Sequence, residues 1–337
     1  MEIGVSDGAA DSQDPDATVR RLMPRLSAAV LNFNGRHLLE IVLPSLIDQR
    51  YRDFETIVVD NGSTDDSVAY LAEHWPEVRV VVTGTRNVGV SAALNMAVAA
   101  AGGELVALLN NDIELDPDWL GELVAALDRH PEAASVAGKL LRFDERGVLD
   151  GAGNIFRRSA TAWQRGAGQP DRGQYDSEQE VFAATAGAAL YRRSALVDVG
   201  PFDESFFAYF EDVDWGLRAQ ISGHRCWYVP SAVAFHMGSR TTRGDADPFY
   251  YELQRRNTLA LLIKDVPLPF IVRNAPHILA HHALGLAYSA RARMLRVHLR
   301  AIRAAWSAAP AWRAERRRIL GTRQVGIGDF DRFVSDR

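Results

Sequence analysis

Short apolar runs alternate with amphipathic stretches over the first third of the chain. The apolar runs 26–31, 55–59, 79–82 and 105–109 predict strands. Between them, apolar residues recur at helical spacing, most clearly in 38–46, 65–75 and 89–101, and predict helices. This alternation predicts a parallel sheet that carries helices on both faces.

Polar clusters follow three of the predicted strands, at residues 32–34, 60–65 and 110–112. In a parallel sheet the ligand lies outside the carboxyl ends of the strands. We therefore expect these three clusters to converge on one edge of the sheet and to form a ligand site there.

The rest of the chain has a less regular pattern. Residues 139–186 are irregular and rich in Gly and Arg, with hairpins expected, and 211–222 predict a helix. The apolar stretches 224–229 and 232–236 predict two short strands. From 250 to about 318 the pattern is helical, with breaks expected at the four prolines Pro267, Pro269, Pro276 and Pro310.

Two segments of the chain suit a nucleotide diphosphate. Asp60 ends the second strand, where its carboxylate can accept the N3 proton of a pyrimidine; in the alternative, Asp60 and Ser63 only cap the next helix. Arg86, Asn87 and Gly89 precede a helix, and an arginine with open amides at a helix start favours phosphate, although an ordinary loop is also consistent. The sequence has no GxxxxGK[ST] pattern, and no GxGxxG follows the first strand, which argues against a dinucleotide cofactor.

A divalent cation would explain the polar end of the fourth strand. Asn110, Asn111 and Asp112 follow a buried run, and Mg²⁺ and Mn²⁺ prefer oxygen ligands. Asp112 would be the main ligand, whereas the alternative is a turn that the Asn side chains stabilise. His236 ends an apolar stretch, and together with Asp112 it becomes a candidate second ligand, although a lone histidine is more often structural.

A second acidic cluster opens the helix predicted at 211–222. Carboxylates there suit the helix dipole, and one of them can instead serve as a general base. Asp214 and Arg218 are spaced i,i+4 and are expected to pair. This assigns Asp214 a structural role and leaves Asp212 free to act as the base.

Six segments in order carry a resemblance to a known family. They read VLNFNG (30–35), VVDNGSTD (58–65), RNVGVSAALN (86–95), LLNNDIELDPDWL (108–120), GPFDESFFAYFEDVDWGLRA (200–219) and FHMGSRTT (235–242). The chain resembles family 2 glycosyltransferases of the GT-A fold over about 26–262, in particular the rhamnosyltransferase-like branch. The resemblance implies an α/β fold: a GT-A type doubly wound, mostly parallel sheet with a C-terminal helical extension.

The resemblance also implies an activity and roles for residues. It implies an inverting glycosyltransferase, of the hexosyltransferase class, that uses Mg²⁺ or Mn²⁺ and a dTDP- or UDP-sugar. L-Rhamnose from dTDP-rhamnose is the first choice of donor. Galactofuranose, glucose and N-acetylglucosamine stay open as alternative sugars. Asp212 would be the catalytic base, and Asp112 and His236 would hold the metal. The donor would contact Asn32, Asp60, Arg86, Asn87, Gly89, Asn110 and Asn111, and the acceptor or the diphosphate would contact Glu211, Trp215 and Arg218. The family's DxD motif begins here with Asn110, so the cation is expected to arrive mainly with the donor.

The domain division follows from the resemblance and from composition. Residues 1–24 are expected to be a disordered leader, without the apolar run of a signal peptide. Residues 25–248 form the predicted GT-A catalytic domain, with a nucleotide-sugar half (25–138) and an acceptor half (139–248). A basic amphipathic helical extension (249–323) and a tail (324–337) follow.

Charge is distributed unevenly between these parts. From Arg255 onward there are 16 Lys and Arg against 5 Asp and Glu, a net charge of +11, whereas the preceding residues carry 22 against 38, a net charge of −16. Basic amphipathic helices with interleaved Trp favour an anionic membrane surface. The alternative is a helical cap on the catalytic domain or on a homodimer partner. No nucleic-acid recognition motif is visible, so nucleic acid is not an expected partner.

Binding to a membrane surface would suit an acceptor that is linked to polyprenyl diphosphate and is used in cell-surface polysaccharide assembly. The alternative is a glycan acceptor. We expect a cytoplasmic protein that is peripheral on the inner face of the cell membrane, since no run of about 18 apolar residues is present. Cys226 is the single cysteine, so no internal disulfide forms. Two rival functions remain at this point: a sugar nucleotidyltransferase, and a non-catalytic nucleotide-sugar-binding protein.

Overall fold

The structure is a computed structural model that describes residues 24–238, 247–321, 324, 331–332 and 334. The predicted leader, apart from residue 24, and most of the predicted tail lie outside the described residues. The end of the last motif, residues 239–242, also lies outside them.

The first third of the chain has the predicted alternation of strands and helices. Its elements are β1 (Leu26–Asn32), α2 (Arg36–Ile47), β2 (Phe54–Asp60), α3 (Ser67–His74), β3 (Arg79–Val82), α4 (Val90–Ala100) and β4 (Leu105–Asn110). Each predicted strand and helix is present, with bounds within a few residues of the expected ones. Next come β5 (Ile113–Leu115) and α5 (Trp119–Arg129), which were not predicted.

The middle of the chain adds strands to the same sheet and contributes α7 (Glu211–Ile221), the helix that opens with the acidic cluster. Its elements are β6 (Ala133–Arg142), β7 (Leu149–Gly151), β8 (Asn154–Phe156), β9 (Ala162–Gln164), β10 (Gln179–Val181), β11 (Ala188–Arg192), α6 (Arg193–Val199), η1 (Glu204–Phe206), α7 (Glu211–Ile221) and β12 (Arg225–His236). The hairpin expected in 139–186 is present as β8 and β9. The two strands expected at 224–229 and 232–236 are one strand, because β12 crosses a bulge between Val229 and Val233 without ending.

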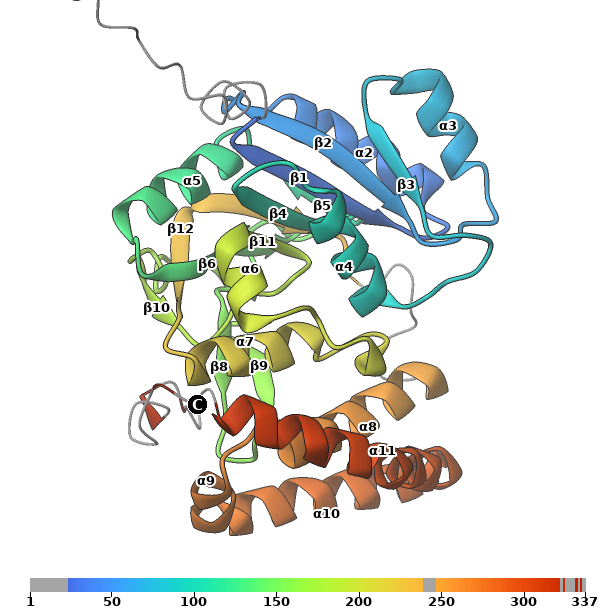
Figure 1. The fold of residues 1–337 in the computed structure, drawn as a ribbon, viewed down its shortest axis with the longest axis vertical. Coiled ribbons are helices and arrows are strands. Elements are labelled where there is room, and N and C mark those ends of the chain that lie inside the picture. Colours follow the sequence, from blue (N-terminus) through green and yellow to red (C-terminus); the bar gives the residue numbers. More distant parts are fainter. Residues whose placement is uncertain (1–23, 239–246, 322–323, 325–330, 333, 335–337) are drawn as a thin grey trace, which may run out of the picture.

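The main sheet has the order β10-β12-β6-β11-β4-β1-β2-β3 (Figure 1). β4, β1, β2 and β3 run parallel to one another, as predicted. β11 runs antiparallel to both β4 and β6, so the sheet as a whole is mixed. This arrangement places the carboxyl ends of β1, β2 and β4 on one edge.

Both faces of the sheet are buried, as a doubly wound fold requires. On β4, Leu105, Ala107 and Leu109 pack in a cluster with residues of α2 and α5. Val106 and Leu108 point to the opposite face and pack with residues of α4, α6 and α7. A strand that is buried on both faces reads as a continuous apolar run, which is why β4 was visible in the sequence.

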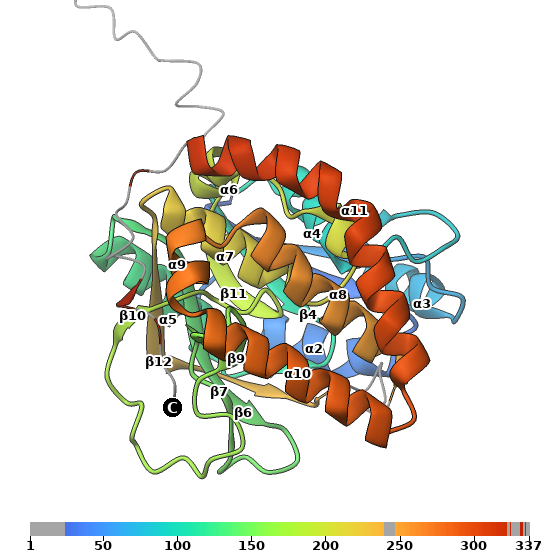
Figure 2. The same cartoon turned by 90° about the horizontal axis from the view of Figure 1, so that it is seen from below.

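Four helices form the C-terminal extension: α8 (Pro248–Lys264), α9 (Leu268–Arg273), α10 (Ala275–Arg291) and α11 (Leu295–Gly321). Figures 1 and 2 show them as a layer beneath α7. A third buried cluster, which includes Phe206, Leu217, Leu261, Phe270 and Trp312, joins this layer to η1 and α7. No helix within the described residues is long and apolar enough to cross a membrane.

Three of the four proline breaks are confirmed. Pro267 precedes α9, and Pro269 and Pro276 lie in the first turns of α9 and α10, where a missing N–H is tolerated. The break expected at Pro310 is wrong, because α11 continues through it. Buried Ala309 and Trp312 on either side anchor this helix, so tertiary packing overrides the local preference.

Candidate active site

The polar side chains at the ends of β1, β2 and β4 form one hydrogen-bonded cluster. Asn32 Nδ2 donates to Asp60 Oδ2 at 3.0 Å, and Asn111 Nδ2 donates to Asn32 Oδ1 at 2.9 Å. All three residues are buried. The predicted convergence of these clusters on one edge is therefore confirmed.

The second carboxylate oxygen of Asp60 shapes the turn that follows β2. It accepts a hydrogen bond from the Ser63 amide at 2.9 Å. Helix α3 begins only at Ser67, with Asp66 at its N-cap, so neither Asp60 nor Ser63 caps it. The alternative reading of Asp60 as a helix cap is wrong.

The loop with Arg86, Asn87 and Gly89 lies against this turn. Gly62 has φ +76°, and a Cβ atom built on it would lie 2.4 Å from the Arg86 backbone, so only glycine permits the contact. Asn61 donates from Nδ2 to Asn87 Oδ1 and to the Gly89 carbonyl, both at 3.1 Å. The Arg86 side chain is exposed at this edge, where it can reach an anion.

The end of β4 meets the end of β12 through a carboxylate and a histidine. His236 Nε2 lies 3.3 Å from Asp112 Oδ2, and His236 Nδ1 lies 2.8 Å from Asp150 Oδ2. Burial lowers the pKa of His236, but the two carboxylates outweigh burial and raise the pKa to about 10. A histidine that is oriented by a carboxylate on its other nitrogen is a common arrangement in metal sites.

The donor set fits a cation that is shared with an anion. Asp112 Oδ1 is buried and has no hydrogen-bond partner among the described residues. The described part of the chain contains no group of three or more His, Cys, Asp or Glu side chains that could hold a metal by themselves. Mg²⁺ is often bound by one or two carboxylates together with substrate phosphates, and Asp112 fits that pattern.

Two adjacent carboxyl groups open α7 and have different pKa values. Burial, together with the charge of Asp212, raises the pKa of Glu211 to about 8. Burial raises the pKa of Asp212 to about 6, against hydrogen bonds from the amides of Val213 (2.8 Å) and Ala186 (3.4 Å). Burial therefore raises the pKa of both carboxyl groups, and the pKa of Glu211 is raised further than that of Asp212.

A short chain of contacts connects Asp212 to the end of β4. The Ala186 amide that donates to Asp212 belongs to the segment just before β11. Its neighbour Gly187 accepts a hydrogen bond from the Asn110 amide at 2.8 Å. Asp212 therefore lies at the same edge of the sheet as Asn110. Asn110 in turn is two residues before Asp112 in the chain.

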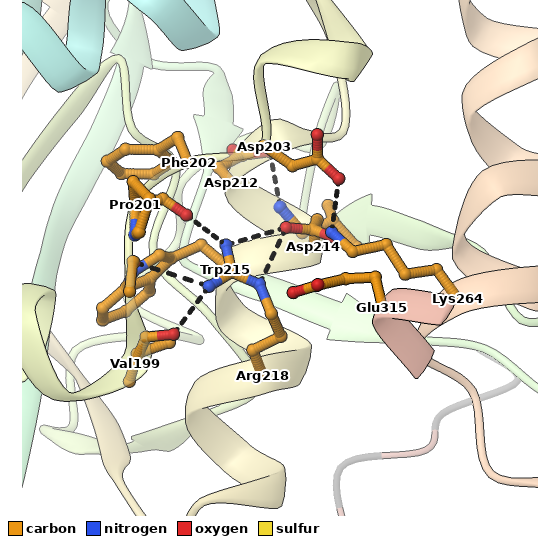
Figure 3. A network of polar contacts seen from close by, with 12 residues as sticks. Val199, Pro201, Phe202, Asp203, Asp212, Asp214, Trp215, Arg218, Lys264 and Glu315 are labelled. Atoms are coloured by element: carbon orange, nitrogen blue, oxygen red, sulfur yellow. Dashed lines mark hydrogen bonds and ion pairs between the residues drawn. The ribbon is translucent and has the colours of Figure 1, made fainter. Parts of the chain in front are cut away.

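A buried ionic network holds α7 to α8 (Figure 3). Arg218 donates to Asp214 Oδ2 from Nη2 at 2.8 Å and from Nε at 3.0 Å, which confirms the predicted i,i+4 pair. Lys264, in the last turn of α8, pairs with Asp214 Oδ1 and, at 2.7 Å, with Asp203. Burial and the negative charge of Asp214 raise the pKa of neighbouring Asp265 well above its ordinary value.

Two residues expected near the acceptor or the diphosphate have structural roles instead. Arg218 is buried, and besides its bonds to Asp214 it donates to the carbonyls of Val199 (2.9 Å) and Pro201 (2.8 Å). Trp215 is buried in the core and donates to the Gly200 carbonyl at 3.1 Å. Neither side chain is available to a ligand, so that expectation is corrected.

Some residues of the site carried no signal in the sequence. Asp150 lies in a region without periodicity, and Lys264 belongs to a segment that was predicted only as a basic amphipathic helical extension. Asn61 lies within a quoted motif, yet its side chain joins two loops. Only contacts between segments distant in sequence reveal these roles.

The family model described as glycosyl transferase family 2 matches residues 27–200. The O-antigen biosynthesis protein RfbC of Myxococcus xanthus is 33% identical over 234 residues, which cover 67% of this chain and 18% of that protein. The N-acetylglucosaminyl-diphospho-decaprenol L-rhamnosyltransferase of Mycobacterium tuberculosis is 32% identical over 240 residues, which cover 64% of this chain and 77% of that protein. This chain therefore matches only a small part of the first relative and most of the second.

Solved structures with low sequence identity share the fold. A mannosyltransferase from Pyrobaculum calidifontis, in complex with GDP-Man and Mn²⁺, superposes with a TM-score of 0.54 at 20% identity and covers 89% of this chain and 86% of its own. Residues 1–349 of Staphylococcus aureus TarS, in complex with UDP-GlcNAc, give a TM-score of 0.56 at 17% identity, with 88% and 91% covered. These similarities support the fold assignment alone.

Proposed function

The chain belongs to glycosyltransferase family 2, and on that premise we propose that it transfers L-rhamnose from dTDP-rhamnose with inversion. The proposed acceptor is a hydroxyl of a saccharide carried on polyprenyl diphosphate. The name of the rhamnosyltransferase relative supports both the sugar and the lipid carrier. The name of the Myxococcus xanthus relative, an O-antigen biosynthesis protein, supports a role in cell-surface polysaccharide assembly.

We propose that Asp212 is the base of this reaction. Its ionised carboxylate accepts the proton of the acceptor hydroxyl while that oxygen bonds to the anomeric carbon, and the bond to the nucleoside diphosphate breaks on the opposite face. The observation that carries this assignment is the position of Asp212 at the start of α7. Its carboxylate accepts a hydrogen bond from the Ala186 amide, next to Gly187, whose carbonyl accepts one from Asn110 at the end of β4.

The donor side of the proposed site is the polar cluster and its neighbouring loop. Asn32 and Asp60 would hold the nucleoside, with Asn110 and Asn111 beside them. The loop of Arg86, Asn87 and Gly89 would face the diphosphate, in line with anion binding at the start of α4. Asp112 and His236 would hold Mg²⁺ or Mn²⁺, which when bound offsets the charge of the leaving diphosphate.

Replacement of Asp212 by Asn tests the assignment. We expect Asp212→Asn to keep its affinity for dTDP-rhamnose and to lose at least a hundredfold in kcat, because a general base contributes about 10²–10⁴-fold. Initial rates with N-acetylglucosaminyl-diphospho-decaprenol as acceptor measure the loss. The control is Asp118→Asn, which removes a carboxylate from an exposed pair with Arg50. Turnover of Asp212→Asn close to wild type would exclude Asp212 from this role.

We also propose that the C-terminal extension binds the anionic inner face of the cell membrane. In α10 only Ile278 and Ser289 are buried, whereas the apolar residues Leu279 and Leu284 are 68% and 70% exposed. α10 contains no acidic residue. It ends at the exposed Arg291, and two more exposed arginines, Arg293 and Arg296, follow it. Apolar side chains flanked by arginines are typical of helices that lie in a lipid headgroup layer.

Flotation with liposomes that contain an anionic lipid tests this proposal. We expect the wild type to float with the vesicles and Leu284→Asp to stay in the soluble fraction. Val197→Asp is the matched control, since Val197 is similarly exposed, at 72%, but lies on α6. A wild-type protein that does not float, or equal loss in both variants, would refute membrane binding through α10.

A further inference from the structure

The loop that leads into α7 has an unusual backbone. Phe207, Tyr209 and Phe210 have φ values of 65°, 68° and 69°, which non-glycine residues, and bulky aromatic ones above all, rarely adopt. Such conformations persist only where the surrounding structure holds them. Glu211 and Asp212 follow immediately, so the position of Asp212 depends on this loop.

Besides ring contacts from Phe249 and Tyr250, a buried asparagine of the C-terminal extension bonds to the backbone of the loop. Asn257, in α8, has an exposed fraction of 0%. Its Nδ2 donates to the carbonyls of Phe206 at 3.1 Å, Ala208 at 2.9 Å and Tyr209 at 2.7 Å. These carbonyls lie on both sides of Phe207, so one amide group ties the loop to α8.

The opposite side of the loop contacts the proposed donor site. The carbonyl of Phe207 accepts a hydrogen bond from the Ser91 amide at 3.2 Å, in the first turn of α4. Gly89 has φ +96°, and a Cβ built there would lie 2.7 Å from the Phe207 ring. The loop therefore lies between the start of α4 and α7, and Asn257 supports it from α8.

We propose that Asn257 is a positioning residue for the transfer reaction: its bonds to the loop set the place of Asp212 relative to the Gly89 turn. The inference rests on the proposed role of Asp212 as the base. It makes α8 part of the catalytic unit, rather than only a support or a membrane contact. Asn257 acts through the backbone and touches neither donor nor acceptor.

Asn257→Ala is the test, and Asn274→Ala is its matched control. Asn274 is also buried in the extension, and its Nδ2 also donates to a carbonyl, that of Phe270 at 3.0 Å, but it does not contact the loop. We expect Asn257→Ala to lower kcat about 100-fold, since small misplacements of catalytic groups have effects of that size. The KM for dTDP-rhamnose should stay within about threefold, because the donor loop keeps its other contacts.

Two further measurements distinguish positioning from general loss of structure. In an Asp212→Asn background, Asn257→Ala should lower kcat no further, because both changes act on the same step. Hydrogen exchange should speed up in residues 206–212 of Asn257→Ala and not in Asn274→Ala. Asn257→Ser, which keeps one donor, should recover part of the activity, and it replaces Asn257→Ala if that variant does not fold.

Several results would overturn the proposal. These are a folded Asn257→Ala with wild-type kcat, losses that add fully to those of Asp212→Asn, or equal losses in Asn274→Ala. If the wild type transfers no sugar, or if Asp212→Asn is fully active, the proposed function fails instead. The exchange measurement still reports whether Asn257 holds the loop.

Discussion

Replacement of Lys264 by Met probes the buried network between α7 and α8. Lys264 is 1% exposed, and its ammonium group lies between Asp214, which is fully buried, and Asp203. Methionine has a similar length and no charge, so the change removes the ion pairs without opening a large cavity. Among the residues that the structure describes, Asp214 then keeps only Arg218 as a cationic partner.

The expected loss of stability follows from the burial of the pair. Removal of one partner of a buried ion pair leaves a charge without full compensation and costs about 3–5 kcal/mol. Asp214 retains its two bonds from Arg218, so we take the lower end, about 3 kcal/mol. With an unfolding entropy of about 2.1 cal/mol/K per residue, a chain of 337 residues shifts by about 1.4 °C per kcal/mol, so the melting temperature should fall by roughly 4 °C.

Urea unfolding followed by circular dichroism measures the free energy of unfolding directly. Arg50→Met is the control, because Arg50 is 72% exposed in its pair with Asp118 and should cost less than about 1 kcal/mol. In Lys264→Met combined with Asp214→Asn, the loss should be smaller than the sum of the single losses, since the two groups compensate each other. A cost for Lys264→Met no greater than that of Arg50→Met would refute the reasoning.

Three further predictions concern the proposed site. Asp212 must be ionised to accept a proton, and its pKa is raised to about 6. The kcat should therefore rise with pH through about 6 and fall about tenfold per pH unit below it. A flat pH profile down to pH 5 would contradict this. EDTA should abolish transfer and added Mn²⁺ restore it, whereas full activity in chelator would show that no metal is needed. Asp150→Ala should raise the Mn²⁺ concentration for half-maximal rate by about 10–100-fold, because His236 loses its orienting carboxylate; an unchanged Mn²⁺ titration would exclude that role.

Local patterns in the sequence predicted the fold where the structure is itself locally determined. The strands β1 to β4 are short apolar runs that end in polar residues, and the helices between them have one apolar face. Strand β11, with the sequence AALYR, was missed because nothing local separates it from a helix start, and α6 follows it directly. The break expected at Pro310 was wrong because buried neighbours on α11 decide that site.

Some residues of the candidate site could likewise be found from local sequence patterns. Asp112, Asp212 and His236 were proposed from their residue types at the ends of strands or the start of a helix, a placement that follows from sequence alone.

By itself the sequence determined the alternating elements, the edge where polar side chains gather and the i,i+4 pair of Asp214 with Arg218. Only the tertiary structure decided that Asp150 orients His236, across 86 residues of chain, and that Asn257 holds a loop 51 residues earlier. Periodicity reports how each residue faces its own helix or strand. Which distant segments meet depends on how those faces pack together, and no local pattern contains that information.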